Sequence, residues 1–106
     1  MGVIRFTLDP EKQKGQTFSS ENYIYRTDPE WKLILDNLPE GRIEVFYGGK
    51  SSMDEMKITK EYGADGVDIP KDYIQRHSTL YADIILYPPG SFSGEDIVKI
   101  MMPVIH

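Results

Sequence analysis

The side chains that could do chemistry are few, and most of them are carboxylates. The 106-residue chain has two histidines, no cysteine, and 17 Asp and Glu residues against 12 Lys and Arg, for a formal net charge of −5. The lack of thiols excludes disulfides, thiolate zinc sites and cysteine nucleophiles. Because the basic residues are also scattered, the electrostatic attraction that nucleic-acid binding needs is missing. We therefore expect no nucleic-acid partner.

No group of residues completes a catalytic or metal-binding motif. Residues 49–51 (GKS) match the end of a phosphate-binding loop, but its first glycine would fall on Glu44. The carboxylates within residues 61–72 lack the spacing of a calcium loop, so a solvated face is the favoured interpretation. His77 lies in a polar turn, and no serine is marked as an activated nucleophile. The sequence predicts a protein that is not an enzyme, with no catalytic, cofactor-binding or metal-binding residues.

Aromatic residues are the remaining signal of function. They make up 11% of the chain, and Tyr81 and Tyr87 alternate with the apolar residues of the 80–86 segment. Exposed tyrosine is typical of protein interfaces and of sugar-stacking platforms, and the interface is favoured here. Residues expected to have no role within the fold lie in the 11–20 and 88–95 segments and on the aromatic face. The interface is predicted to contain Tyr81, Tyr87, Phe92, Phe18, Pro88 and Pro89.

The elements that must position these residues are mainly strands. Apolar and polar residues alternate with a period of two, which indicates half-buried strands. The segments with this pattern are 4–8, 31–35, 43–47, 56–59, 80–86 and 98–104. Residues 28–31 could start a helix, but the alternation from Trp31 favours a strand. A helical turn is expected at 70–74, behind Pro70.

Turn signals separate these strands. We expect a hairpin loop at 37–41, turns at 48–52 and 63–66, a loop over 11–20 and a longer loop over 88–96. Pro103 cannot donate a ladder hydrogen bond, which predicts an edge strand or a bulge for the last segment. Short strands between regular turns are typical of a single all-β domain over residues 1–106, with no membrane-spanning segment.

Several segments together are similar to a known family. These are DPEWKL (28–33), LPEG (38–41), IEVFY (43–47), VDIPKDYI (67–74), LYADIILY (80–87) and MPVI (102–105). They resemble the immunoglobulin-like β-sandwich domains of tailed-phage virion proteins, such as the N-terminal domain of baseplate upper proteins and related minor structural proteins. The resemblance implies a single antiparallel sandwich of about seven or eight strands, without catalytic residues.

The resemblance also implies a function. It suggests a virion structural protein made in the bacterial cytoplasm: a decoration, auxiliary or connector subunit that binds a capsid or tail lattice, or a second copy of itself. The edge strand that ends at His106 could pair with a neighbour's strand. Members of the family usually continue into fibre, coiled-coil or receptor-binding modules; we expect none here, which disfavours a fibre or receptor-binding role. The alternative is a small carbohydrate-binding module whose aromatic face holds a glycan.

Overall fold

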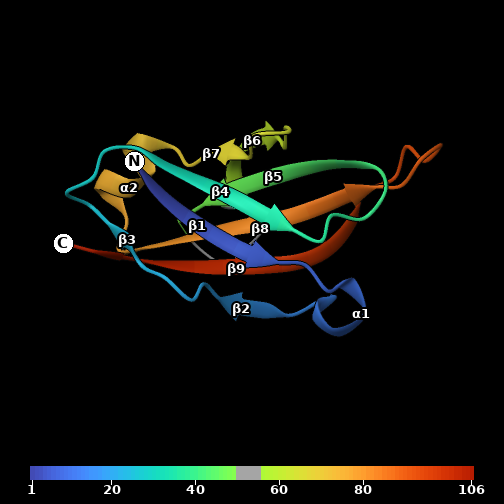
Figure 1. The fold of residues 1–106 in the computed structure, drawn as a ribbon, viewed down its shortest axis with the longest axis horizontal. Coiled ribbons are helices and arrows are strands. Elements are labelled where there is room, and N and C mark those ends of the chain that lie inside the picture. The colour runs from blue at the N-terminus through green and yellow to red at the C-terminus, as the bar shows by residue number, and fades with distance from the viewer. Residues whose placement is uncertain (50–55) are drawn as a thin grey trace.

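The computed structural model describes residues 1–49 and 56–106 and shows an all-β protein of two packed sheets (Figure 1). The predicted fold class, a β-sandwich, is confirmed. In chain order the elements are β1 (Gly2–Thr7), α1 (Pro10–Gln13), β2 (Thr17–Ser19), β3 (Ile24–Tyr25), β4 (Trp31–Asp36), β5 (Arg42–Gly48), β6 (Met56–Glu61), β7 (Val67–Asp68), α2 (Lys71–Arg76), β8 (Thr79–Tyr87) and β9 (Glu95–Ile105). Neither helix in the described ranges is long and apolar enough to cross a membrane.

Both sheets contain parallel as well as antiparallel strand pairs. The smaller sheet has the order β1-β4-β7, and the larger has the order β2-β9-β8-β5-β6, with β3 also pairing with β9. The pairs β4–β7, β5–β6, β5–β8 and β8–β9 are antiparallel, as expected. The pairs of β1 with β4 and of β2 and β3 with β9 are parallel. The expectation of a purely antiparallel sandwich is therefore wrong: the sheets are mixed at their edges, where β1, β2 and β3 run parallel to their partners.

The alternation seen in the sequence is what builds the core. Trp31, Leu33 and Leu35 of β4 point inward and are buried, and the even-numbered residues of β8 from Leu80 to Leu86 face them from the larger sheet. Burial of such side chains stabilises the fold by about 1.5–3 kcal/mol each. The helical turn expected after Pro70 is α2, whose Tyr73 and Ile74 are buried at one end of the sandwich.

Three local predictions are wrong. Residues 37–41 form no hairpin, because β4 lies in the smaller sheet and β5 in the larger, so this segment crosses between sheets. The 11–20 segment is not a continuous loop. Pro10 starts α1, the Gln13 side chain accepts a hydrogen bond from the Asp9 amide at 2.8 Å, and Thr17 begins β2. A proline and a back-bonding side chain are thus enough to start a short helix.

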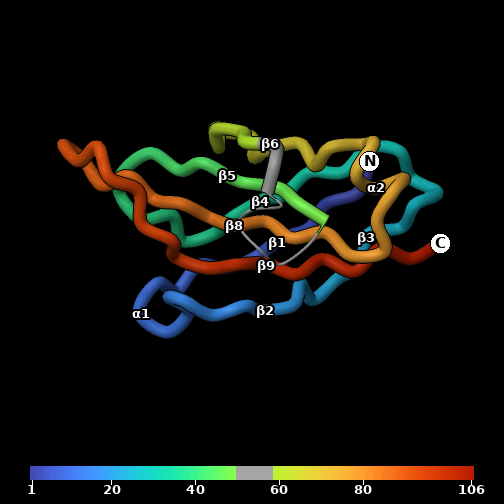
Figure 2. Tube along the Cα trace, turned by 180° about the vertical axis from the view of Figure 1, so that it is seen from behind, coloured from blue at the N-terminus to red at the C-terminus, as the bar shows by residue number. Residues whose placement is uncertain are grey.

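The third correction concerns β9, which is not an edge strand. It pairs with β8 on one side and with β2 and then β3 on the other (Figure 2). Pro103 falls between Met101, the last partner of β2, and Val104, the first partner of β3. The Lys99 amide bonds toward β2 and the Val104 amide toward β8, so position 103 would donate into the break between β2 and β3. A proline is tolerated there, and a second copy has no free β9 edge to pair with.

Candidate functional site: an aromatic groove beside strand β1

The residues predicted from the sequence as an interface do not form one surface. Phe92 is fully exposed in the β8–β9 loop, where Pro89 is also exposed and Pro88 is half-buried. Tyr81 and Tyr87 are half-buried near opposite ends of β8, which separates them by about 20 Å along the strand. Phe18 is partly buried and packs against the core from β2. The structure therefore spreads these side chains over several places.

A group of exposed apolar side chains lies instead where the N-terminal strand meets β3. Val3, Tyr23 and Tyr25 are 38%, 49% and 51% exposed. They line a groove of about 410 Å³ together with Trp31, Glu21 and Asn22; we call this the N-terminal groove. Ile105, also exposed, is the register partner of Tyr25 across β3 and β9. Single exposed apolar residues are ordinary, whereas a group of them marks a binding surface.

Trp31 forms the floor between β1 and β3. Its indole lies directly beneath Gly2, where any Cβ atom would collide with the ring, so the small residue lets the ring extend under β1. The indole N–H donates to the carbonyls of Tyr25, at 3.2 Å, and Asp28, at 3.0 Å. The ring centroids of Tyr25 and Trp31 are 6.4 Å apart, within the range of favourable aromatic contacts.

Arg26 holds the β3 side of the groove in place. Its backbone N–H donates to the Ile105 carbonyl at 2.8 Å. Its guanidinium donates to the carbonyl of Ile74 at 2.9 Å and to that of His77 at 2.8 Å, at the end of α2. Hydrogen bonds from a charged donor to buried carbonyls are among the stronger ones in proteins. The tyrosines therefore project from a fixed backbone, which reduces the entropy lost on binding.

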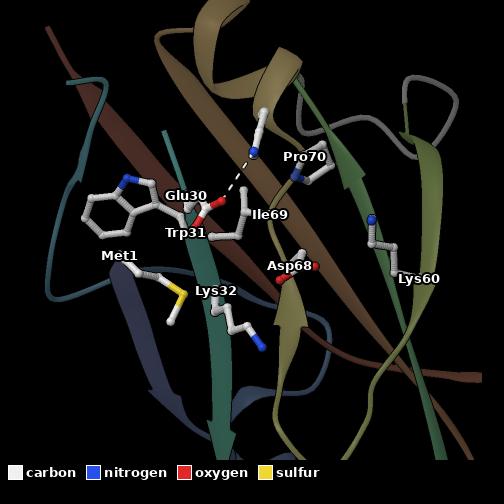
Figure 3. A pocket seen from close by; sticks show the side chains of 9 residues that line it. Met1, Glu30, Trp31, Lys32, Lys60, Asp68, Ile69 and Pro70 are labelled. Atoms are coloured by element: carbon white, nitrogen blue, oxygen red, sulfur yellow. Dashed lines mark hydrogen bonds and ion pairs between the residues drawn. The ribbon is translucent and has the colours of Figure 1, made fainter. Parts of the chain in front are cut away.

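A second groove lies on the other side of Trp31 and is polar. It has a volume of about 450 Å³ and carries charges of both signs. Figure 3 shows Lys32 of β4 and Lys60 of β6 on either side of Asp68, and Lys71 pairs with Glu30 at 3.5 Å. Exposed pairs of this kind contribute little to stability. Because cations and carboxylates are interspersed, this groove has no single-sign field that would select an anion.

The carboxylates of the 61–72 segment do not converge on a metal. Asp68 faces this mixed groove, and Asp72 pairs with Arg76 at 3.2 Å on the surface of α2. In the described part of the chain, no three His, Asp or Glu side chains are grouped so that they could hold a metal ion. His77 ends α2 and packs edge-on against Tyr73, with ring centroids 5.3 Å apart, which gives it a packing role.

The most perturbed carboxylate is Asp83, on the outer face of the larger sheet. It is fully buried, and neither of its oxygens has a hydrogen-bond partner. Its cross-strand neighbours are Phe46 on β5 and Lys99 on β9. Burial raises the pKa of Asp83 from an ordinary 3.8 to about 7; Asp96 adds to the rise and Lys99 opposes it. An Asp83 carboxyl that is half-protonated near neutral pH is costly to ionise.

Residues 50–55 lie outside the described part of the chain. The expected turn at 48–52 falls partly on them and stays a prediction. The incomplete phosphate-loop match at 49–51, which the sequence already disfavoured, also falls partly on them. The tyrosines of the N-terminal groove were missed in the sequence. The signal that could have found them is the order Tyr23, Ile24, Tyr25: Ile24 is fully buried between two exposed rings, as expected for one inward position of a strand.

Comparison with known proteins shows similarity to part of a longer protein. No family model matches the chain. The chain is 28% identical over 90 residues to an uncharacterized ATP-dependent helicase of Mycoplasma genitalium. The match covers 85% of this chain but only 8% of the helicase. The chain is thus similar to a small part of a much longer protein.

Proposed function

We propose that this chain is a non-enzymatic binding module that docks on a protein partner through the N-terminal groove. The observation that carries the proposal is the gathering of Val3, Tyr23 and Tyr25 around the indole of Trp31. Tyrosine and tryptophan supply large contact areas at low conformational cost, and they are enriched where proteins bind one another. The activity named for the similar helicase is not part of this proposal, because the match covers only 8% of that protein.

The rigidity of the groove supports the same proposal. Arg26 fixes β3 to α2 and β9, and Gly2 admits the indole under β1. A preformed surface of this kind can bind with little rearrangement. The partner implied by the family resemblance, a phage capsid or tail lattice, stays a prediction, as does self-association.

A second candidate, a carbohydrate-binding module, has one observation in its favour. Glu21 and Asn22 line the same groove as the two exposed tyrosines, so polar groups that could bond sugar hydroxyls lie beside rings that could stack on a sugar face. A glycan array separates the two candidates. A glycan ligand that binds wild type and is lost with Tyr23→Ser would favour the carbohydrate module over the protein-binding module.

The experiment that tests the main proposal compares two exposed aromatic residues. A partner is captured with the immobilised chain from the source cells or particles, purified, and titrated against each variant. We expect Tyr23→Ser to weaken binding by at least tenfold, because it removes an exposed ring from the groove. The matched control is Phe92→Ser, which removes a fully exposed ring from the β8–β9 loop and should leave the affinity within twofold. Loss of binding with Phe92→Ser alone would contradict the proposal.

A further inference from the structure

The edge of the smaller sheet beside the N-terminal groove is open. Among the described strands, β1 pairs with β4 alone and lies at the end of its sheet. The Gly2 amide donates to the Glu30 carbonyl at 2.8 Å and the Leu8 amide to the Asp36 carbonyl at 3.0 Å. In a parallel pair the backbone groups of even-numbered β1 residues therefore face β4. Those of Val3 and Arg5 face the open side.

The open edge is bounded at its far end. The Thr7 carbonyl accepts a hydrogen bond from the Gln13 side-chain amide at 3.1 Å, so α1 closes the edge there. The free stretch is thus short, with two outward N–H and two outward C=O groups, and it begins at the residue that also lines the N-terminal groove. An unpaired edge next to an apolar groove is the arrangement that accepts an added strand.

We infer that the N-terminal groove binds an extended segment of a partner protein, which adds as a strand to β1 at Val3 and Arg5 and places apolar side chains against Tyr23 and Tyr25. This inference rests on the proposed function and names the class of partner. Main-chain hydrogen bonds to the edge would supply affinity, and alternate side chains entering the groove would supply specificity.

The chemistry of the segment follows from the groove. Among the described residues that line it, Glu21 alone is charged, and the whole chain carries a net charge of −5. Arg5, at the edge itself, is paired with Asp36 at 3.3 Å. The segment should therefore alternate apolar and polar residues and carry at least one Lys or Arg near Glu21.

A slender segment fits this edge better than a second folded copy. In an antiparallel β1–β1 pair, each copy would bring its own α1, held beside Thr7, toward the N-terminal groove of the other. An extended peptide has no such element. Self-association through β1 is therefore an outcome that the experiment must separate from peptide binding.

The test starts from a displayed library of random 12-residue peptides, selected against the wild-type chain. The best peptide is then synthesised and titrated against Val3→Pro and Val3→Thr. Proline removes the outward N–H of Val3 without removing a bond to β4, and is tolerated at such edge positions; threonine keeps both the N–H and the β-branched shape. We expect at least a tenfold loss of affinity with Val3→Pro and less than a twofold change with Val3→Thr.

Amide hydrogen exchange on the wild-type chain gives a readout that does not depend on a variant folding. Without peptide, the outward amides of Val3 and Arg5 should exchange quickly, whereas those of Ile4 and Phe6, which face β4, should be protected. Saturating peptide should slow exchange at Val3 and Arg5 by at least tenfold and leave Ile4 and Phe6 unchanged.

The outcomes separate this inference from the proposed function. If Val3→Pro binds like Val3→Thr and the outward amides stay unprotected, while Tyr23→Ser still loses binding, strand addition is overturned and the docking groove stands. If Tyr23→Ser also binds like wild type, both the strand addition at β1 and the docking function of the N-terminal groove are overturned. Failure of the selection to enrich any peptide, or a dimer that Val3→Pro dissociates, would overturn the assignment of an extended peptide as the occupant.

Discussion

Replacing Asp83 with asparagine should stabilise the protein, and the gain should grow with pH. Asp83 is fully buried with both oxygens unpartnered, and its pKa is raised to about 7. Between the ordinary pKa of 3.8 and about 7, the folded state therefore binds more protons than the unfolded state. The free energy of unfolding therefore falls as the pH rises between these two pKa values. Above pH 7 the folded protein bears the full cost of ionising the buried Asp83 carboxyl.

The size of this pH-dependent change in stability follows from the difference between the ordinary pKa of Asp83 and its raised pKa in the folded protein. At 1.36 kcal/mol per pH unit, the rise from 3.8 to about 7 sets an upper bound of about 4 kcal/mol. Relaxation and water penetration reduce such penalties in real proteins, so we expect Asp83→Asn to gain about 2 kcal/mol more at pH 8 than at pH 4.5. The asparagine amide can also donate to the Asp96 carboxylate at every pH, which Asp83 can do only while its carboxyl is protonated.

The assay is urea unfolding of both proteins at half-unit steps from pH 4.5 to 8, with the free energy of unfolding compared at each pH. Asp65→Asn is the matched control, because it makes the same change in net charge at an exposed turn residue. The reasoning would be refuted if the difference between Asp83→Asn and wild type did not change with pH, or if the variant lost stability at pH 8.

Three further changes test the packing around the N-terminal groove and the turns. Trp31→Ala should destabilise the protein by about 3–5 kcal/mol in urea unfolding, because it empties the space between β1 and β3; a loss below 1 kcal/mol would contradict the assigned packing. Arg26→Ala should cost about 1–3 kcal/mol by removing the bonds to the α2 carbonyls, and thermal unfolding with Arg26→Lys should show only partial rescue. Gly66→Ala should cost more than 1 kcal/mol, because φ is +89° and the new Cβ would lie 2.8 Å from a backbone carbonyl oxygen; Gly90→Ala, also at positive φ but in open space, should cost less.

The sequence was most informative where one face of a strand is buried. Alternation around Trp31 and along β8 identified both strands and their inward residues, because a period of two is a local property of the chain. Pairing is not local. Nothing near residues 37–41 distinguishes a hairpin from a crossing between sheets, since that depends on β1 and β7 occupying both sides of β4.

The candidate site was harder to predict for a related reason. Tyr25 belongs to a strand of only two residues, too short to show a period, and Tyr23 directly precedes that strand. The exposure of both rings depends on Arg26, which binds carbonyls about 50 residues away in sequence. Asp83 occupies what reads as an outward position of β8, where a carboxylate is ordinary. Only the packing of the outer face shows that it is buried.

The position of β9 between β8, β2 and β3 has a consequence for how the protein folds. The short strands β2 and β3 reach their hydrogen-bonding partner only in β9, and the Arg26 guanidinium meets the His106 ring, 80 positions later. During synthesis, β2 and β3 must therefore wait unpaired until β9 has left the ribosome. Closing contacts over such sequence separations is slow compared with forming local hairpins. The same late step anchors β3, so the N-terminal groove should be among the last parts of the protein to form.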